Sequence, residues 1–394
     1  MSQGLLKREL GMGGAVVTGL GSIVGTGAFV AIGIASSRWG DVVIWAIPLT
    51  ALVAVFNGMS SAFLAGRFPV AGGTYEYGYR ALNPWLGFTA GWLFLLAKTA
   101  SAATAALGVA LYLGVDNPLL PIGAVVSIML LVLSGIRRTA LTNALLVGIT
   151  VAAIAWFAWS GLTGSDTIGA FGFAIGEQPG SLLAATAFLF VAYTGYGRIA
   201  TLGEEVKEPA RIIPRAVIIT LAVAMLLYLA IELGGRALGG ESWGAILELG
   251  FLDMPFVTFG AITAMLGVLL NLILGLSRVW LAMGRRRDMP GGLAALDGRG
   301  EPRIAIIVSS VVVAGITLLG DVGLAWSFSA MTVLLYYGLT NLAALALDRR
   351  RLTGWLGLGS CVFLSFFVAL PVWLAGAGLI GAGLLWKAAH TRLT

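Results

Sequence analysis

Two stretches inside long apolar segments hold the groups of this chain best suited to bind a small molecule, and those groups belong to the backbone. Residues 19–29 carry four glycines in nine positions, and residues 190–198 carry two glycines among tyrosine and threonine. Each glycine weakens a helix by about 1 kcal/mol relative to alanine. Membrane helices lose regular hydrogen bonding only where the released groups face protein or a watery cavity. Both stretches are therefore predicted to interrupt a membrane helix.

An interrupted helix offers two chemically opposite ends. The N–H groups that start one half carry about half a positive charge and bind anions, whereas the carbonyl end of the other half suits an ammonium group or a small cation. An α-amino acid carries both charges close together and matches two such ends without any acidic or basic side chain. The alternative is close helix packing, because Gly21 and Gly25 form a Gly-x-x-x-Gly pair.

The sequence offers few side chains of the kinds that catalyse reactions or bind metals. Cys361 is the single cysteine and His390 the single histidine, which excludes a disulfide within the chain and argues against a metal site or a Ser-His triad. The glycines at 19, 21 and 25 do not have the spacing of a P-loop, and no lysine–serine pair follows them. We expect no enzymatic activity, no cofactor and no metal site.

The elements that must position the two stretches are membrane helices. The chain is 59% hydrophobic and 11% charged, with a mean hydropathy of +0.96, and many apolar runs reach the ~20 residues that cross a bilayer. The sequence predicts an all-α polytopic membrane protein with one transmembrane domain over residues 1–394. About twelve spans are expected, the last two separated near Pro371, at residues 10–37, 42–67, 82–113, 119–136, 139–162, 182–204, 214–233, 254–284, 304–320, 324–347, 355–370 and 372–387.

Basic residues gather in alternate loops, and this distribution gives an orientation. With the N-terminus inside, Arg38 and Arg236 are the only basic residues of the outer loops. Because lysine and arginine bias sets topology, both termini are expected in the cytoplasm and the protein in the inner or plasma membrane. The alternation also argues against nucleic acid as a partner of the +6 charge, whereas membrane lipid can contact residues 285–287 and 349–351. The inner loops hold Arg67, Arg80, Arg137, Arg138, Lys207, Arg211, Arg215, Arg285, Arg286, Arg287, Arg299, Arg303, Arg349, Arg350 and Arg351.

The two interrupted spans occupy the same place in two consecutive sets of five. Since each set has five spans, the second begins on the opposite side of the membrane, which predicts an inverted repeat. Residues 1–165 would form the first repeat, 178–350 the second, and 351–394 two extra helices with a short tail. Paired interruptions at corresponding positions point to a binding site near the membrane midplane.

Five motifs resemble the amino acid–polyamine–organocation superfamily. They are GSIVGTGAF at residues 21–29, PVAGGTY at 69–75, AYTGY at 192–196, EEVKEPARIIPR at 204–215, and SR with AMGR at 277–285. They follow the family's order and cover the first eight spans. The resemblance implies the leucine-transporter-like fold, a five-plus-five inverted repeat with helices 1 and 6 discontinuous, and transport by alternating access.

The same resemblance implies roles for residues of both stretches. The first stretch would bind the substrate carboxylate, the second would line the amine side, and aromatic residues would close the site from outside. From the sequence itself, Glu204 and Glu205 are expected to pair with arginines such as Arg198 when the inner side is shut, and an ordinary solvated charge cluster is the alternative. The substrate residues are Ser22, Ile23, Gly25, Thr26, Gly27, Phe190, Val191, Ala192, Tyr193, Thr194 and Gly195, and the gate candidates are Phe190, Tyr193, Arg198, Glu204 and Glu205.

Lys98 lies about halfway along the third predicted span. An uncompensated charge at mid-bilayer costs about 2.5–3.5 kcal/mol on insertion scales, and a buried lysine readily shifts its pKa. A proton-linked or structural cation inside the bundle is one interpretation, and a lysine that reaches an interface is the other. A cationic substrate would find no acid at the middle of spans one, three, six or eight, so neutral amino acids are favoured.

The ion beside the substrate stays open at this point. Family members that lack sodium carry a lysine in span five, where this chain has Thr150. The hydroxyls of Thr150 and Ser277 could serve sodium, the site could be free of ions, or Lys98 could replace the missing lysine. Some relatives pair covalently with a partner subunit, but Cys361 lies in an apolar segment near the end, so no such pairing is expected.

Together these features predict a secondary-active amino acid transporter that works as a proton symporter or exchanger. A sodium-coupled symporter and a channel-like facilitative carrier for a small amine or organic cation are the alternatives.

Overall fold

The computed structural model describes residues 10–70, 72–115, 117–164, 179–201, 206–239 and 254–393. These residues form helices joined by short turns, and they contain no strand beyond one isolated parallel bridge between Leu10 and Val206. The prediction of an all-helical polytopic protein is confirmed to this extent.

The first half of the chain begins with an interrupted helix. It consists of α1 (Met12–Ile23), the π-helix η1 (Gly27–Ala31) and α2 (Ile32–Trp39), and a short 3-10 turn, η2 (Gly40–Val42), leads onward. The elements that follow are α3 (Val43–Arg67), α4 (Thr74–Ala81), α5 (Pro84–Leu113), α6 (Leu119–Leu133) and α7 (Ile136–Gly164). The short helix α4 lies where the hydropathy pattern predicts a loop, since its sequence, TYEYGYRA, contains three tyrosines and no aliphatic side chain larger than alanine.

The second half also begins with an interrupted helix, α8 (Pro179–Tyr193) and α9 (Tyr196–Thr201). The remaining elements are α10 (Pro209–Gly239), α12 (Pro255–Arg285), η5 (Gly291–Ala294), α13 (Arg303–Thr317), α14 (Val322–Leu347), α15 (Leu352–Ser365) and α16 (Leu370–Leu393). The last two helices are separated by the turn at residues 366–369, and Pro371 lies in the first turn of α16, where a missing N–H costs nothing.

Seven helical segments of the described chain are long and apolar enough to cross a membrane. Five shorter apolar helices accompany them, among them α1 and most of α8, which are short because the chain breaks there. The seven are Gly27–Arg67, Pro84–Leu113, Leu141–Gly161, Pro209–Ala237, Pro255–Arg285, Val322–Leu347 and Leu370–His390.

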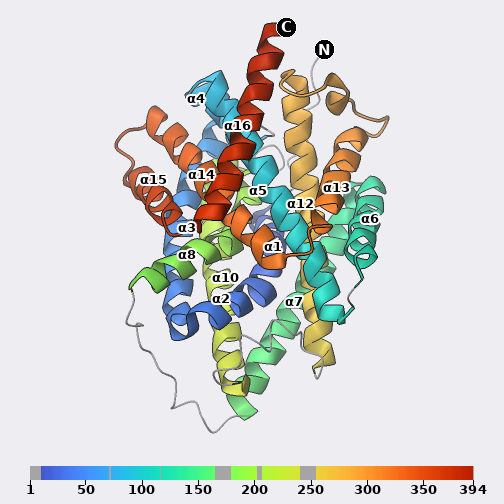
Figure 1. Ribbon diagram of the computed structural model, residues 1–394, viewed down its shortest axis with the longest axis vertical. Coiled ribbons are helices and arrows are strands. Elements are labelled where there is room, and N and C mark those ends of the chain that lie inside the picture. Colours follow the sequence, from blue (N-terminus) through green and yellow to red (C-terminus); the bar gives the residue numbers. More distant parts are fainter. Residues whose placement is uncertain are drawn as a thin grey trace.

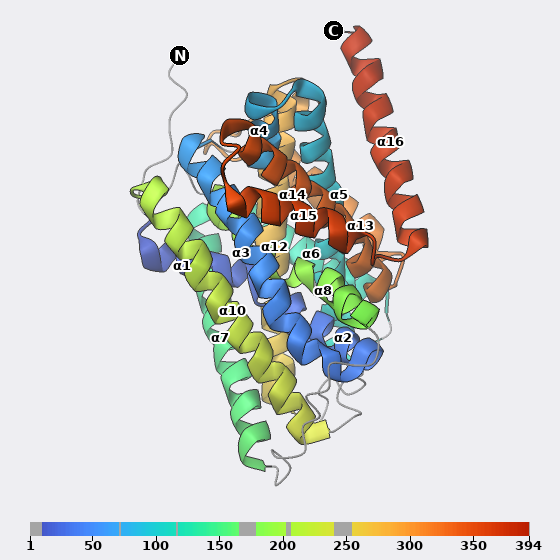
Figure 2. The same cartoon turned by 90° about the vertical axis from the view of Figure 1, so that its left-hand side faces the viewer.

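Helix α5 lies at the centre of the bundle and α16 at its edge. The apolar part of α5 is 89% buried and that of α16 only 17%, and Figure 2 shows α16 standing beside the other helices. Helix α12 packs along α5 and α7, α10 packs along α3, and α8 lies against α3. The interrupted helix α1 packs against α7, α10 and α12, and α8 packs against α3 and α14. Figure 1 shows the course of the helices.

Candidate functional site

The first interruption leaves backbone donors without backbone acceptors. Helix α1 ends at Ile23, Val24 adopts an extended conformation, and the helix resumes after Gly25. In the described part of the chain, no carbonyl accepts from the N–H groups of Gly25, Thr26 or Gly27, whereas Ala28 already donates to the Gly25 oxygen at 3.0 Å. Three donors therefore start the helix that continues to Trp39, which is the arrangement that binds an anion.

The second interruption touches the first. Helix α8 ends at Tyr193, and Thr194 and Gly195 form a turn before α9. A Cβ atom on Gly195 would lie 2.2 Å from the Ser22 carbonyl oxygen, and one on Gly27 would lie 2.7 Å from Ala192 Cβ. Only glycine permits these approaches. Both interruptions predicted from the sequence are present, and the fold brings them into backbone contact.

Tyrosines of neighbouring helices satisfy carbonyls that the interruptions release. The Tyr228 hydroxyl of α10 lies 2.9 Å from the Ile23 oxygen and 2.8 Å from the Ala192 oxygen, and it donates to them. The Tyr337 hydroxyl of α14 donates to the Thr194 oxygen at 3.1 Å. These bonds make the irregular backbone tolerable in an apolar surrounding. Neither tyrosine is among the residues expected from the sequence, although their position within apolar spans was a usable signal.

A pair of buried amides joins three helices beside the first interruption. Asn271 of α12 donates to the Gly21 oxygen at 3.2 Å and to Asn143 Oδ1 of α7 at 2.6 Å. Both asparagines are buried. Neither asparagine was expected from the sequence. A charged side chain within a membrane span is costly and so indicates a special site, whereas an uncharged amide gives a weaker indication.

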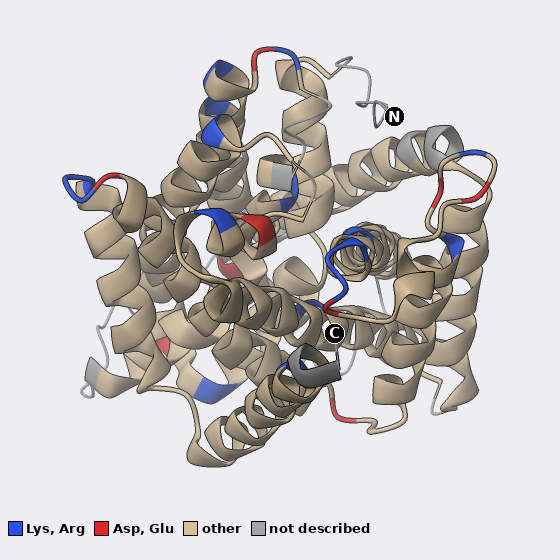
Figure 3. Cartoon of the chain, turned by 90° about the horizontal axis from the view of Figure 1, so that it is seen from above, with Lys and Arg blue, Asp and Glu red and all other residues tan. Residues whose placement is uncertain are grey.

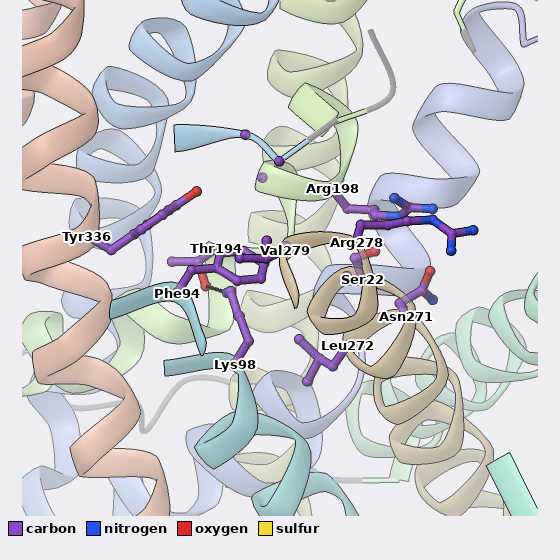
Figure 4. A pocket seen from close by; sticks show the side chains of 15 residues that line it. Ser22, Phe94, Lys98, Thr194, Arg198, Asn271, Leu272, Arg278, Val279 and Tyr336 are labelled. Carbon is purple, nitrogen blue, oxygen red and sulfur yellow. Dashed lines mark hydrogen bonds between the residues drawn. The ribbon is translucent and has the colours of Figure 1, made fainter. Parts of the chain in front are cut away.

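Lys98 points from α5 to the second interruption. Its ammonium donates to Thr194 Oγ1 at 2.9 Å, and that hydroxyl donates to the Val191 oxygen at 2.8 Å. The side chain is 7% exposed, and no described carboxylate lies within 4 Å of the ammonium. Figure 4 shows Lys98 facing Thr194. Of the two interpretations, the lysine within the bundle agrees with this placement.

A small buried cavity lies between the two interruptions. Its volume is about 30 Å³, enough for about two water molecules. The Thr26 hydroxyl is buried there and has no hydrogen-bond partner among the described residues. Eight of the eleven predicted substrate residues line it; the full lining is Ser22, Ile23, Thr26, Gly27, Lys98, Ser101, Val191, Ala192, Thr194, Gly195, Val268, Leu272 and Trp326.

A second cavity of about 50 Å³ extends from the same place toward two arginines. Arg198 and Arg278 line its far end together with the turn before α4, and Arg278 pairs with Glu301 at 3.4 Å. Figure 4 shows both arginine side chains pointing away from Lys98. Its lining is Ser22, Gly72, Gly73, Phe94, Lys98, Thr194, Gly195, Gly197, Arg198, Asn271, Leu272, Gly275, Arg278, Val279 and Tyr336.

Three predicted substrate residues lie outside both linings. The Phe190 ring packs edge-on against Tyr337 with centroids 5.8 Å apart, and the Tyr193 hydroxyl donates to the Ile47 oxygen at 3.1 Å. Gly25 contacts α12 instead. The two aromatic gate candidates thus point into neighbouring helices in this conformation.

The other sequence candidates lie apart from the interruptions or beyond the described chain. The Thr150 hydroxyl donates to the Leu146 oxygen at 2.7 Å, and Ser277 donates to the Leu274 oxygen at 2.8 Å. Both bonds stay within their own helices. The gate candidates Glu204 and Glu205 lie outside the described residues.

A polar network closes the end of the bundle near α4. Buried Asp288 accepts from the hydroxyls of Tyr75 and Tyr79 at 2.7 and 2.5 Å and pairs with Lys387 of α16. Arg286 holds Glu76 through two hydrogen bonds of 2.7 Å, and this carboxylate raises the pKa of the guanidinium. Helices α4, α12 and α16 are joined at this end as a result.

Comparison with known proteins gives the site its context. The family described as "Amino acid permease" matches residues 14–239 and 253–353. An uncharacterised transporter of Mycobacterium tuberculosis is 37% identical, covering 96% of this chain and 90% of its own length. The branched-chain amino acid permease of Bacillus subtilis is 25% identical over 73% of this chain and 70% of its own, and a methylthioribose transporter of that organism is 25% identical over 88% and 82%.

The family match covers most of the chain, including both interrupted helices and the cavity between them, and it agrees with the resemblance carried by the five motifs. This chain belongs to the amino acid permease family of the amino acid–polyamine–organocation superfamily.

Proposed function

We propose that this protein is a secondary-active transporter that moves one amino acid across the membrane by alternating access. The observation that carries the proposal is the meeting of two interrupted helices at a buried cavity. The unpaired N–H groups of Gly25–Gly27 and the unpartnered Thr26 hydroxyl could bind an anionic group there. A substrate carboxylate would bind these donors, and the carbonyls of Ile23 and Ala192 would receive the ammonium group.

The proposed architecture is the leucine-transporter-like fold with twelve spans, two inverted repeats of five and two added helices. Support comes from which helices pack together. Helices α3 and α10 are the second members of the two proposed repeats and α5 and α12 the third, and each pair lies in contact. Such pairing is expected when two repeats surround one site.

The proposed substrate has no positive side chain, and a neutral amino acid remains the expectation. No carboxylate of the described residues lines either cavity, whereas Lys98, Arg198 and Arg278 do. A cationic side chain would meet repulsion without compensation. The same lining gives no support to the alternative carrier for an organic cation.

We assign proton coupling to Lys98. The ammonium is buried without a described carboxylate, so its charge is costly to keep, and it bonds to the turn that the substrate must contact. Loss of the proton would weaken the bond to Thr194, because a neutral amine is a poorer hydrogen-bond donor than an ammonium, and would thereby alter the second interruption. Sodium at the hydroxyls of Thr150 or Ser277 is the competing assignment, and the experiment below separates the two.

We place the protein in the cell membrane with both termini in the cytoplasm. Viewed from the end of the bundle at which α4 lies, the chain shows many lysines and arginines (Figure 3). Helices α3 and α12 end at this face with Arg67 and Arg285, and α13 begins there with Arg303. Basic residues prefer the cytoplasmic side.

Thermal stabilisation of the purified protein by each of the twenty amino acids tests the proposal. We expect one amino acid, or a small group of similar ones, to raise the unfolding temperature saturably, because a ligand that binds only the folded state stabilises it. Measurements with and without sodium at two pH values would identify the coupling ion. If no amino acid stabilises the protein, and none is taken up by liposomes that contain it, the proposal fails.

A further inference from the structure

The hydroxyl of Tyr228 lies where the carbonyl ends of both interruptions converge. It approaches the Ile23 oxygen at 2.9 Å and the Ala192 oxygen at 2.8 Å, and Tyr228 is 1% exposed. The same hydroxyl lies 2.7 Å from the position a Cβ of Gly27 would take. A single hydroxyl proton is therefore shared between one acceptor of each interrupted helix, next to the free N–H donors.

Other released carbonyls have partners of their own. Tyr337 donates to the Thr194 oxygen, Asn271 to the Gly21 oxygen, and Tyr112 to the Phe29 oxygen. None of these donors connects the two interrupted helices with each other. Tyr228 is distinct because its hydroxyl occupies the point at which an ammonium group would contact both helices.

We propose that the Tyr228 hydroxyl substitutes for the substrate's ammonium group whenever the carrier changes conformation without cargo. Buried acceptors are costly to leave unpaired, so a transporter whose substrate supplies the only donor cannot close when empty. With Tyr228 the chain supplies that donor itself. When an amino acid binds, its ammonium group would donate to the Ile23 and Ala192 carbonyls in place of the Tyr228 hydroxyl.

This inference rests on the proposed function and extends it to the transport cycle. A carrier that closes without cargo can return empty and accumulate substrate, as a symporter must. A carrier that closes only when loaded performs one-for-one exchange. Tyr228 thus assigns this protein to net transport, and removal of its hydroxyl should convert it to an exchanger.

The test compares net uptake with exchange in proteoliposomes. The probe is a mixture of the twenty L-amino acids labelled with ¹⁴C, offered to vesicles that are either empty or loaded with the same unlabelled mixture. For Tyr228→Phe we expect net uptake into empty vesicles to fall at least tenfold relative to the wild type, while exchange stays within about twofold. A hydroxyl with a purely structural role would lower both rates together.

Tyr112→Phe is the matched control, because it removes a buried tyrosine hydroxyl that bonds a carbonyl beyond the junction. Its ratio of net uptake to exchange should equal that of the wild type. Equal losses of both activities in Tyr228→Phe, or an unchanged ratio, would overturn the inference.

The wild-type protein supplies a second arm should the variant fail to fold. We expect it to fill empty vesicles at a rate within about tenfold of exchange, and a wild type that only exchanges contradicts the role of Tyr228. Absence of both activities in the wild type would instead refute the proposed function itself.

Discussion

At the scale of single residues, the site depends on glycines, whose missing Cβ atoms allow close backbone contact, and on a few polar side chains that hydrogen-bond to the interrupted helices. Gly195 and Gly27 permit the interrupted helices to touch, and Lys98 supplies a cation to the junction. The glycine clusters could be identified from the sequence because their density conflicts with helix formation. The tyrosines could be noted as polar groups within apolar spans, but the carbonyls served by Tyr228, Tyr337 and Asn271 could not be identified, since each is distant in sequence and only the packed bundle brings them together.

Gly27→Val should abolish amino acid binding. Its Cβ would lie 2.7 Å from both Ala192 Cβ and the Tyr228 hydroxyl, so the added methyl groups would fill the junction and cover the N–H donors. Binding can be measured by ligand-induced thermal stabilisation. Gly123→Val on α6, where a Cβ meets no atom within 4 Å, is the control and should bind normally. Unchanged affinity in Gly27→Val would remove the carboxylate site from consideration.

Lys98→Met should remove the pH dependence of uptake. The substitution keeps most of the side-chain volume and deletes the group that takes up and releases the proton, so uptake driven by a pH gradient should fall to the level seen without one. Initial rates in proteoliposomes with and without an imposed gradient provide the measurement. Lys207→Met, at an exposed position, should behave as the wild type. Full pH-driven accumulation by Lys98→Met would exclude this lysine as the coupling group.

At the scale of helices, the interrupted segments belong to α1 and α8, whereas the polar network at the end of the bundle belongs to α4, α16 and the residues after α12. The hydropathy pattern places nearly every long helix, and the glycine clusters divide two of them correctly. It does not reveal α4, because a helix of eight residues with three tyrosines has no apolar run. It also does not reveal the network that ties α4 to α16, since Tyr75 and Lys387 are separated by most of the chain. Their common partner, Asp288, follows an arginine run that looks like ordinary solvated charge.

Asp288→Asn should loosen the end of the bundle at α4. Asp288 is 2% exposed and serves two tyrosines and Lys387, and loss of one partner from a buried pair costs about 3–5 kcal/mol. We expect a lower unfolding temperature in detergent and faster proteolysis near α16. Asp321→Asn, which retains the side-chain cap at the start of α14, should unfold like the wild type. Equal stability of both variants would show that the network does not hold α16 in place.

At the scale of the whole molecule, charge and apolar surface are sorted by position. Lysines and arginines crowd one end (Figure 3), and the periphery carries exposed apolar residues such as Leu374 and Leu385 of α16. Loop composition was enough to predict this sorting, because loops rich in lysine and arginine alternate with loops in which acidic residues outnumber the two arginines. The packing of α3 on α10 and of α5 on α12 lay beyond the sequence pattern, which contains spans but no distances between them.

Cysteine labelling of intact cells should establish the proposed orientation. In a Cys361→Ser background, a cysteine at Leu319, which is 71% exposed between α13 and α14, should react with a membrane-impermeant maleimide. A cysteine at Gly298, exposed in the loop before α13, should react only after the cells are opened. The reverse pattern would place the termini outside, and labelling of both in intact cells would contradict a membrane barrier between them.

The contact between Gly195 and Ser22 also bears on how such a protein could acquire a new cargo. Because backbone meets backbone there, Gly195 and Gly27 cannot take a larger side chain without moving a neighbour, and the backbone groups proposed to fit the common part of a substrate are fixed. Selectivity for the substrate side chain would then depend on other residues that line the cavity, such as Ser101, Val268, Leu272 and Trp326. An engineer who wished to redirect this carrier would leave both glycine stretches untouched and randomise those four residues.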